Sequence, residues 1–450
     1  MDPVFTTDSA GSIPVDLVTE ASWPQLTATP RLRAFADAMG FKPDAGSRLV
    51  LAAEDGAIER VVFGLGGGSD GLAVAALAAS LPAGRYAIAA LPDTYPMEWV
   101  TSGWLDGAYR FTAYRSAGAP PQLVLPEEIA SDADREARAI RLLRDLVNTP
   151  AEEMGPSGLQ AAVSNLAENT GATLEVTLGD ALLTANYPMI HAVGRAAEDP
   201  PRLLELSWGK PTDPVLAIVG KGVAFDTGGL NIKTGDYMRL MKKDMGGAAH
   251  AIALAQLVME AQLPVQLKLL VPAVENSVAG NAFRPGDVLK TRKGLNVEID
   301  NTDAEGRLIL CDAIARAEEN QPDLMMDFAT LTGAARVALG PDLAPFYTDN
   351  DSLAGTLEEG STVSGDPVWR MPLWRPYKSM LSSSIADISN SGGRMAGSIT
   401  AAVYLSQFVE RPNNWMHFDI WAWREGRYGR PAGGAATGLR AVWAMLRARY

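Results

Sequence analysis

The sequence has very little thiol or imidazole chemistry. Its 450 residues include one cysteine, Cys311, and three histidines, His191, His250 and His417. A single cysteine excludes intramolecular disulfides and argues against thiolate zinc sites, and so few histidines argue against a histidine-rich metal site. We expect Cys311 to be a core residue of a helix and each histidine to satisfy a hydrogen bond rather than bind metal. One unpaired cysteine also fits a reducing compartment.

Long apolar runs and a basic charge balance are also absent. The most apolar stretch, near Gly71 to Leu81, is too short and alanine-rich to span a bilayer, and the acidic N-terminus does not resemble a signal peptide. Lys and Arg total 39 against 53 for Asp and Glu, which is a net charge of −14. Because an acidic chain repels phosphate backbones, we expect no nucleic-acid partner. We also expect no membrane partner and a cytoplasmic location.

Several common catalytic motifs are missing. There is no G-x-S-x-G nucleophile elbow and no H-E-x-x-H zinc helix, which excludes the serine hydrolases and zinc proteases that use them. The glycine run Gly64 to Gly68 matches neither G-x-G-x-x-G nor G-x-x-x-x-G-K-[ST]. It therefore predicts a tight turn rather than a phosphate cradle.

The chain is long enough for two domains, and its 47% apolar and 20% charged residues are typical of a globular protein. Residues 1–132 alternate short apolar runs with Gly and Pro breaks, which predicts a small N-terminal α/β domain. Apolar residues spaced by 3.6 between Asp132 and Val147 predict an amphipathic helix that Asn148-Thr149-Pro150 ends. We interpret residues 133–150 as a linker helix and 151–450 as the larger domain.

Strands and helices alternate through the larger domain, which favours an α/β/α sandwich with a mostly parallel mixed sheet. The expected helices are 157–169, 246–260, 308–319, 399–408 and 438–449. The expected strands are 173–178, 189–193, 203–208, 215–219, 265–271, 324–329 and 415–421. The predicted fold class is therefore α/β in both domains.

Two segments of the larger domain carry the chemistry. The first, G-K-G-V-A-F-D-T-G-G-L-N-I-K, follows the strand 215–219 and holds Lys221, Asp226 and Lys233, with Asp244 shortly beyond it. In open α/β sheets, ligands bind at the C-terminal ends of the strands, where glycines let the backbone turn tightly. These residues therefore lie where a site is most expected.

The second segment, N-T-D-A-E-G-R-L, runs from Asn301 to Leu308. In an extended chain Asp303, Glu305 and Arg307 would share one face, because side chains repeat every two residues. With Asp226 and Asp244, the two carboxylates Asp303 and Glu305 supply four negative charges. That charge matches two divalent cations about 3.5–4 Å apart.

Each of these elements also has a structural alternative. Lys221 in a glycine-rich loop is typical of a phosphate contact or of solvent exposure. Asp244 is a common residue type at a helix N-cap, and the second segment alone is typical of a solvated turn. The spacing indicates a metal site but leaves these alternatives open.

Taken together, the motifs resemble the leucyl aminopeptidase (cytosol aminopeptidase) family of dinuclear zinc or manganese exopeptidases. V-G-K-G-V-A-F-D-T-G-G-L-N-I-K, M-x-x-M-K-K-D-M-G-G-A-A and the family's signature octapeptide N-T-D-A-E-G-R-L occur in order. V-P-A-V-E-N from Val271, R-P-G-D-V from Arg284 and D-F-A-T-L-T-G-A from Asp327 are similar as well. The resemblance covers residues 140–450 and implies that 151–450 is the catalytic domain.

The resemblance implies which residues hold the metals. Lys221, Asp226, Asp244 and Glu305 would hold the tighter-bound ion. Asp226, Asp303 and Glu305 would hold the exchangeable one, where the Asp303 carbonyl oxygen is a further ligand. The ions would be Zn or Mn, with Mg or Co also expected at the exchangeable site. A lysine can ligate only as a neutral amine, which nearby cations and burial favour by depressing its pKa.

The resemblance also implies a mechanism for peptides with a free N-terminus. The amino group of the substrate would bind the metals, the scissile carbonyl would be polarised, and a bridging water would have its pKa lowered from about 15.7 to roughly 7. Lys233, as a cation, would stabilise the tetrahedral oxyanion. Arg307 cannot act as a general base, and in the family it holds a bicarbonate ion that shuttles the proton.

The family's pocket for the first side chain matches Met241, Thr330 and Gly333, which suits an apolar, leucine-like group. The strand W-M-H-F-D-I-W-A-W-R-E-G departs from the family's H-x-D-I-A-G, since Trp421 and Trp423 replace small residues. Either the tryptophans narrow the pocket or they are a harmless core change. The metal residues are unaffected in both cases.

The resemblance further implies a homohexamer whose active sites face an enclosed interior. Other functions stay open at this point. Some members of the family bind DNA, which the acidic balance here argues against. A lysine in a glycine loop with magnesium is typical of a phosphate-handling enzyme. An inactive scaffold is disfavoured because no metal position is lost.

Overall fold

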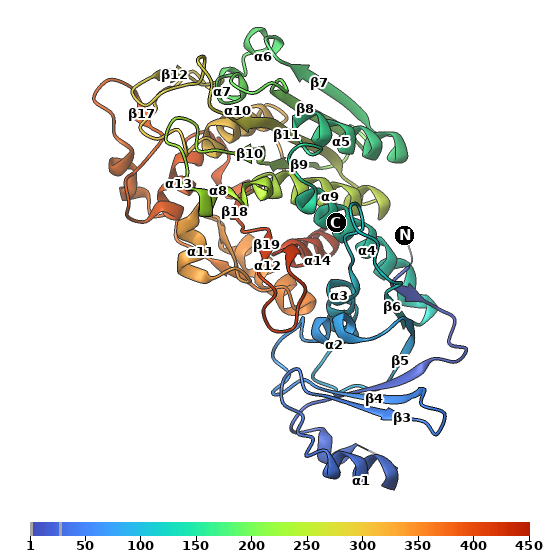
Figure 1. Ribbon diagram of the computed structural model, residues 1–450. Coiled ribbons are helices and arrows are strands. Elements are labelled where there is room, and N and C mark those ends of the chain that lie inside the picture. The colour runs from blue at the N-terminus through green and yellow to red at the C-terminus, as the bar shows by residue number, and fades with distance from the viewer. Residues whose placement is uncertain (1–2, 27–28) are drawn as a thin grey trace. The chain divides into compact units, whose positions relative to one another are not determined.

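A computed structural model describes residues 3–26 and 29–450 (Figure 1). The chain forms two compact units. The first consists of Met1–Arg141, Thr362–Asp366 and Arg424–Gly433, and the second of Leu142–Ser361, Pro367–Trp423 and Gly434–Tyr450. The long helix α4 (Glu127–Asn148) begins in the first unit and ends in the second. The division of the chain at a linker helix 133–150 stays a prediction.

The first unit is built on a six-stranded sheet with flanking helices. Its elements are β1 (Phe5–Thr6), β2 (Ile13–Val18), η1 (Trp23–Gln25), α1 (Pro30–Ala38), β3 (Arg48–Ala52), β4 (Ile58–Gly64), α2 (Val74–Ser80), β5 (Gly84–Ala90), α3 (Met97–Ala108) and β6 (Pro121–Val124). The order is β1-β6-β5-β2-β4-β3, and every neighbouring pair is parallel except β3 with β4. The α/β prediction for this part of the chain is confirmed.

The second unit is built on a nine-stranded mixed sheet. Its strands are β7 (Thr173–Leu178), β8 (Arg202–Trp208), β9 (Val215–Gly220), β10 (Gly222–Asp226), β11 (Gln266–Asn276), β14 (Leu324–Ala329), β15 (Ala344–Tyr347), β16 (Val368–Arg370) and β18 (Trp415–Asp419). The order is β16-β15-β18-β14-β9-β11-β8-β7, with β10 also paired to β11. The strands β18, β14, β9, β11 and β10 run parallel. The strand β8 is antiparallel to both β11 and β7, and β15 is antiparallel to β18 but parallel to β16.

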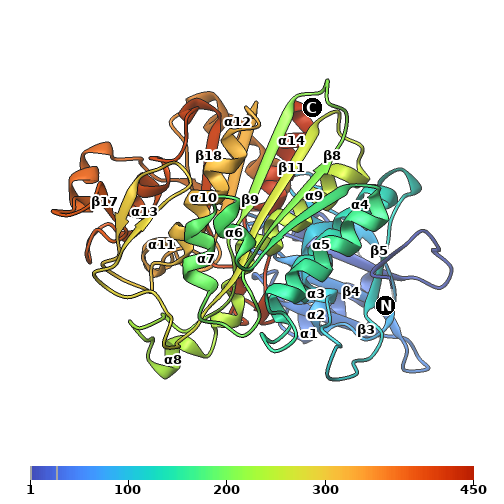
Figure 2. The ribbon, with the colours of Figure 1, turned by 90° about the horizontal axis from the view of Figure 1, so that it is seen from above.

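Helices cover both faces of this sheet. The helices of this unit are α5 (Pro156–Thr170), α6 (Ala181–Thr184), α7 (Pro188–Gly194), α8 (Gly235–Met238), α9 (Gly246–Glu260), α10 (Gly306–Glu318), α11 (Gly333–Leu339), α12 (Asp351–Ser364), α13 (Gly397–Leu405) and α14 (Leu439–Arg449). Figure 2 shows α5 and α9 on one face and α7 and α10 on the other. The predicted sandwich with a mostly parallel mixed sheet is confirmed.

Short elements complete the chain. They are the strands β12 (Val288–Lys290), β13 (Asn296–Glu298) and β17 (Ile388–Ser389) of a small sheet, the paired β19 (Trp423–Arg424) and β20 (Gly433–Gly434), and the 3-10 helices η2 (Met241–Lys243), η3 (Arg375–Leu381) and η4 (Pro412–Asn414). Within residues 3–26 and 29–450, no helix has the length and apolar character that a membrane crossing requires.

The central strands are buried on both faces, which explains their uninterrupted apolar sequences. Every residue of β14 is buried, and so is every residue of β9 after Val215. Because β9, β11, β14 and β18 are parallel, their C-terminal ends meet at one edge of the sheet. Residues at or just after these ends, such as Lys221, Asn276 and Asp419, are therefore neighbours in space.

One predicted strand is wrong. Residues 189–193 lie in helix α7, which begins at Pro188. Proline favours the first position of a helix, and the periodicity of so short an apolar run does not distinguish a buried strand from a buried helix. The other elements predicted for the larger domain are present. The helix 246–260 and the strands 173–178 and 324–329 have the predicted bounds, and the rest differ at their ends.

Candidate metal centre

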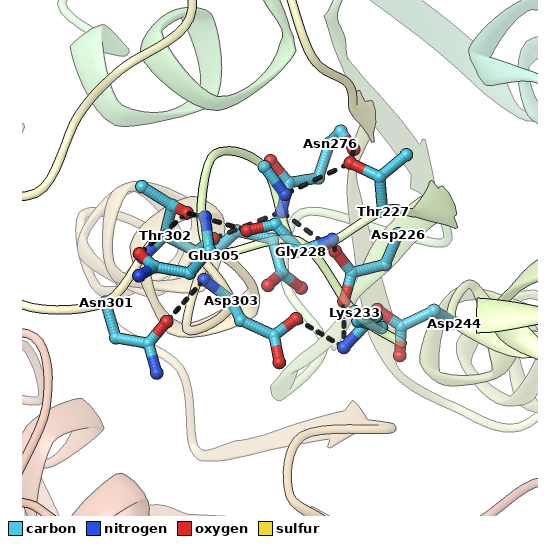
Figure 3. Close-up of polar contacts among 12 residues, drawn as sticks. Asp226, Thr227, Gly228, Lys233, Asp244, Asn276, Asn301, Thr302, Asp303 and Glu305 are labelled. Carbon is cyan, nitrogen blue, oxygen red and sulfur yellow. Dashed lines mark hydrogen bonds and ion pairs between the residues drawn. The ribbon is translucent and has the colours of Figure 1, made fainter. Parts of the chain in front are cut away.

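The candidate metal ligands gather at the C-terminal edge of the large sheet (Figure 3). Lys221 directly follows β9, Asp226 ends β10, and Asp244 lies between η2 and α9. Asp303 lies in a turn, and Glu305 is the N-cap residue of α10. The sheet topology thus brings the two chemistry-bearing segments of the sequence to one place.

Lys221 is enclosed by polar partners. Its Nζ lies 2.7 Å from Asp244 Oδ2 and 2.9 Å from Glu305 Oε1, and it donates a hydrogen bond to the Thr330 carbonyl oxygen at 2.9 Å. A Cβ at Gly306 would lie 2.5 Å from Lys221 Cε, so only glycine at the start of α10 lets the lysine approach this closely. Because the ammonium is fully engaged, the structure argues against the phosphate-binding alternative.

Lys233 connects two other carboxylates. Its Nζ lies 2.8 Å from Asp226 Oδ2 and also pairs with Asp303 Oδ1 (Figure 3). The lysine side chain is 14% exposed, whereas that of Lys221 is 3% exposed. Lys233 is therefore the lysine of the pair that a bound molecule can reach more easily.

A hydrogen-bond network orients Asp226. Its Oδ1 accepts from the Gly228 N–H and from Asn276 Nδ2, both at 2.8 Å. Asn276 Nδ2 also donates to the Thr302 carbonyl oxygen at 3.1 Å, and Thr302 Oγ1 donates to the Gly228 carbonyl oxygen at 2.6 Å. Sequence reasoning did not assign Asn276 or Thr302, although both lie inside family-like motifs. The network ties the first segment to the second.

The side chains fit divalent cations. Carboxylate oxygens of Asp226, Asp244 and Glu305 lie within 4.8 Å of one another, and all three residues are buried. Among the described residues, Glu305 Oε2 is buried without a hydrogen-bond partner. Buried carboxylates this close repel one another unless cations lie between them, and carboxylate oxygens suit Mg and Mn as well as Zn.

Burial and neighbouring charges shift the pKa values of the titratable groups in this cluster. Burial, followed by the charge of Asp226, raises the pKa of Glu305 to about 8 and that of Asp303 to about 6. Burial lowers the pKa values of Lys221 and Lys233, but the surrounding carboxylates outweigh it and hold both above the usual lysine range. In the absence of metal both lysines are cations, so Lys221 must lose a proton before its nitrogen can bind a metal.

Two local interpretations are corrected by the structure. Asp303, Glu305 and Arg307 do not share one face of an extended chain, because Asp303 lies in a turn and Arg307 lies in the first turn of α10. Asp244 is not a helix N-cap: α9 begins after Met245, and no side chain caps it. Instead, Asp244 Oδ1 accepts a hydrogen bond from Thr330 Oγ1 at 2.8 Å. Sequence periodicity cannot show these turns.

Arg307, in the first turn of α10, has its own set of contacts. It is buried, its Nη1 donates to the Asn390 carbonyl oxygen at 2.7 Å, and its Nε has no hydrogen-bond partner among the described residues. Asn390 in turn donates to the Asn301 carbonyl oxygen at 2.7 Å, which links Arg307 to the signature octapeptide. Burial lowers the pKa of Arg307 from its usual value.

A cavity of about 560 Å³ opens beside the carboxylates. Its lining includes Met241, Thr330 and Gly333, the residues that the resemblance assigned to the substrate pocket, and also Trp421. Trp423 is not part of the lining, and its ring centroid lies 5.7 Å from Lys242 Nζ. The structure therefore distinguishes the two tryptophans. Trp421 lines the cavity, so it is more than a core substitution, whereas Trp423 does not line it.

Trp421 is flanked by cations. Lys243 Nζ lies 3.9 Å and Arg336 Cζ 4.3 Å from the centroid of its ring. Lys243 is 2% exposed and lines the cavity. Burial lowers the pKa of Lys243 to about 8, below the usual lysine range. Sequence reasoning did not single out Lys243, because nothing in the motif shows which way its side chain points.

Asp419, at the end of β18, positions the loop that follows β14. Its Oδ1 accepts hydrogen bonds from the N–H groups of Leu331 at 3.1 Å and Thr332 at 3.0 Å. Its Oδ2 accepts from Thr332 Oγ1 at 2.6 Å and from Ser398 Oγ at 2.7 Å. Both oxygens of the Asp419 carboxylate therefore accept hydrogen bonds, and Asp419 holds in place the loop whose Leu331 and Thr332 line the cavity.

The histidines and the cysteine lie outside this centre. His417 Nδ1 lies 2.6 Å from Asp327 Oδ1, and His191 Nε2 lies 3.1 Å from Asp180 Oδ1. His250 Nδ1 lies 2.7 Å from the Gly246 carbonyl oxygen. Cys311 is fully buried in α10. Each therefore has the hydrogen bond or core position that we expected.

A buried cluster of carboxylates and lysines beside a large cavity, at the strand ends of a mixed α/β sheet, defines a metal-dependent hydrolase. The chain belongs to the cytosol aminopeptidase family: residues 141–443 match the model of its catalytic domain, and residues 13–126 match that of the M17 aminopeptidase N-terminal domain. It is thus a metal-dependent aminopeptidase, a hydrolase of peptide bonds, and the resemblance seen in the sequence is confirmed.

Individual relatives agree with this assignment. Peptidase B of Enterobacter sp. (strain 638) is 40% identical over 336 residues, which cover 72% of this chain and 78% of that protein. The crystal structure of the cytosol aminopeptidase from Coxiella burnetii is 43% identical, covers 98% of both chains and has a TM-score of 0.92. The bottromycin maturation enzyme BotP, solved in complex with Mn, is 33% identical over 97% of this chain and 99% of that one, with a TM-score of 0.87.

Proposed function

We propose that this chain releases the N-terminal residue of peptides with the help of two divalent metal ions. The observation that supports this most strongly is the position of Glu305, which is 1% exposed, has one carboxylate oxygen paired with Lys221 and leaves the other without a partner. A buried carboxylate of this kind suits a ligand shared by two cations. The tighter ion would be held by Lys221, Asp226, Asp244 and Glu305, and the exchangeable ion by Asp226, Glu305 and Asp303.

The mechanism assigns separate work to the protein's own side chains. When bound, the metals would polarise the scissile carbonyl and lower the pKa of a coordinated water to roughly 7. Lys233 lines the cavity as a cation, so its ammonium would stabilise the negative charge that develops on the carbonyl oxygen. Asn276 and the Gly228 N–H keep Asp226 oriented, which preserves the position of the Lys233 ammonium as well.

Arg307 would hold a bicarbonate ion, which would relay a proton during the reaction. The unpartnered Nε of Arg307 supports this role, because a guanidinium offers donors that match a planar anion in pairs. A guanidinium does not give up its own proton, so Arg307 would position the anion rather than act as a base.

The remaining assignments follow from the pocket and from the relatives. Met241 and Gly333 line the cavity and support a preference for an apolar, leucine-like first side chain. Zn or Mn would be the metals, and the Mn complex of BotP supports the second choice. We also propose a homohexamer and a cytoplasmic location, the latter because curated relatives are named cytosol aminopeptidases. The acidic chain gives no support to nucleic-acid binding.

A paired substitution tests the function. The protein is stripped of metal, reloaded with Mn or Zn, and assayed for release of leucine from Leu-Gly. We expect Asp303→Asn to abolish turnover, because the exchangeable ion loses a ligand. Asp300→Asn, an exposed carboxylate on the same loop, is the matched control and should retain it. Equal turnover by the two variants would contradict the proposal.

A further inference from the structure

The turn that carries Asp303 is held by asparagine side chains. This turn, residues 300–304, lies between β13 and α10 and belongs to neither. The N–H groups of four successive residues, from Asp300 to Asp303, each donate to an asparagine Oδ1, and Figure 3 shows the bond from Asp303 to Asn301. In a helix or a sheet, backbone carbonyl oxygens would accept such bonds. The position of Asp303 therefore depends on side chains.

Asn390 contacts the first half of the turn. It directly follows β17, which runs parallel to β13, so the asparagine lies beside the residues that follow β13. Its Oδ1 accepts from the N–H groups of Asp300 at 2.8 Å and Asn301 at 3.2 Å, and its Nδ2 donates to the Asn301 carbonyl oxygen at 2.7 Å. The residue is fully buried. An amide can donate and accept here without adding charge beside the carboxylates.

Thr302 fixes the middle of the turn. Its N–H donates to Asn231 Oδ1 at 2.8 Å, and its Oγ1 accepts from the Asn231 N–H at 2.8 Å. The same Oγ1 donates to the Gly228 carbonyl oxygen at 2.6 Å, and Asn276 Nδ2 donates to the Thr302 carbonyl oxygen at 3.1 Å. Thr302 is fully buried. Two segments distant in the chain thus hold the turn, one through Asn390 and the other through Thr302.

The other candidate ligands lie outside this turn. Lys221 follows β9, Asp226 ends β10, and Asp244 follows η2. Glu305 is the N-cap residue of α10 and pairs with Lys221. Asp303 is the one candidate ligand within the turn, and the proposed function assigns it to the exchangeable ion alone. A displaced turn should therefore weaken the binding of that ion more than the binding of the other.

We propose that Asn390 and Thr302 are positioning residues for the exchangeable metal ion. They act through the backbone of the turn, which sets the place and direction of the Asp303 carboxylate. The proposal rests on the proposed function and concerns how the second metal site is filled. Removal of either set of contacts leaves buried backbone groups of the turn without partners, so the turn must shift to satisfy them.

The test measures Mn binding to metal-stripped protein by calorimetry, as two separate affinities. We expect Asn390→Ala to keep the affinity for the first ion and to lower that for the second by roughly 10–100-fold, the range typical of a lost supporting residue. Its turnover of Leu-Gly should recover as the Mn concentration is raised, because every metal ligand is kept. Asn414→Ala is the matched control, since Asn414 Nδ2 donates to one backbone carbonyl oxygen, that of Pro322, before β14. Both of its affinities should equal those of the unsubstituted protein.

A second pair of variants tests the proposal if Asn390→Ala does not fold. Thr302→Val replaces the hydroxyl by a methyl group of similar size and should lower the affinity for the second ion. Thr302→Ser keeps the hydroxyl and should keep that affinity. Hydrogen exchange of the metal-free proteins gives a readout without turnover, in which residues 300–303 should exchange faster in Thr302→Val than in Thr302→Ser.

The outcomes separate this inference from the proposed function. If the unsubstituted protein binds two ions and cleaves Leu-Gly, but the variants lose both ions equally or lose neither, the positioning role is wrong and the proposed function stands. If the unsubstituted protein binds fewer than two ions or does not cleave Leu-Gly, the proposed function fails and this inference fails with it.

Discussion

The cavity of the second unit has two ends of opposite chemistry. At the metal end, Asp226, Asp244 and Glu305 crowd their oxygens together, and burial raises the pKa of Glu305 to about 8. At the other end, Lys243 lies against the ring of Trp421, and burial lowers its pKa to about 8. The same desolvation thus acts on groups of opposite sign, because burial disfavours the charged form of the carboxyl group and of the amine alike.

The two ends also differ in how they are built. The metal end is held by a network of hydrogen bonds, in which Asn276, Thr302 and Thr330 each connect one segment of the chain to another. The Trp421 end depends on ring contacts and packing against Gly246. A substitution at the metal end should abolish the reaction, whereas a substitution at the Trp421 end should alter which substrate is used. This difference explains how Trp421 can depart from the family pattern while every metal position is kept.

The largest expected effect is at Glu305. Glu305→Gln keeps the shape of the side chain and removes its charge, so we expect loss of metal binding and a fall in kcat/KM for Leu-Gly of more than roughly a thousandfold. Metal content by mass spectrometry and turnover on the same sample check this. Trp421→Ala is the comparison from the other end: it should bind metal as the unsubstituted protein does while its residue preference changes. Loss of metal from the Trp421 variant would show that the two ends are not separable.

An intermediate effect is expected at Gly306. The Cβ of Gly306→Ala would lie 2.5 Å from Lys221 Cε and 2.7 Å from its Nζ, so the lysine must shift away from the carboxylates. We expect metal affinity to fall by roughly 10–100-fold, the range typical of a displaced supporting residue. Gly235→Ala, at the start of α8 with nothing within 4 Å of the new Cβ, is the control. Calorimetric Mn titrations measure both, and equal affinities would show that the approach of Lys221 is not critical.

The smallest effect concerns the support that both ends share, the first turns of α9. His250 Nδ1 donates to the Gly246 carbonyl oxygen and its Nε2 accepts from the Thr437 N–H, so the buried ring is neutral. Burial lowers the pKa of His250 to about 4, against 6.5 for an ordinary histidine. A base with a lowered folded-state pKa contributes stability that is present above 6.5 and is lost as the pH falls from 6.5 towards 4.

The loss should approach about 1.4 kcal/mol per pH unit in that window, because unfolding takes up one proton at this residue. Urea midpoints at pH 7.0, 6.0 and 5.0 measure it. His250→Gln cannot titrate and should show a correspondingly shallower dependence on pH than the unsubstituted protein. Parallel pH profiles for the two proteins would contradict the neutral, buried assignment.

Much of the fold could be predicted from the sequence, because its signals are local. The helix at Gly246–Glu260 and the strand at Leu324–Ala329 have the predicted bounds, since long apolar periodicity and flanking glycines mark them. The helix at Pro188–Gly194 was missed because the run is short enough to suit either a strand or a helix. We expected the residues after Ile299 to be extended. In the structure, Asp303 lies in a turn and Glu305 is the N-cap residue of α10.

The candidate metal residues were recognisable because the motifs that hold them are contiguous. The residues that support them were not recognisable from the sequence, because the contacts that they make join segments distant in the chain. Asn276 reaches Asp226, Asn390 reaches Arg307, and Lys243 turns its ammonium towards Trp421, and each contact depends on the sheet topology. The sequence showed that Trp421 and Trp423 replace small residues, but the structure was needed to show which one lines the cavity.

The central claim is that the carboxylate and lysine cluster holds two metal ions that enable peptide hydrolysis. Its most direct test adds Mn stepwise to metal-stripped protein and measures, in each sample, the ions bound per chain and the cleavage of Leu-Gly. We predict that two ions bind, that turnover rises as the second site fills, and that Glu305→Gln shows neither. Full turnover by metal-stripped protein in the presence of a chelator would contradict the account.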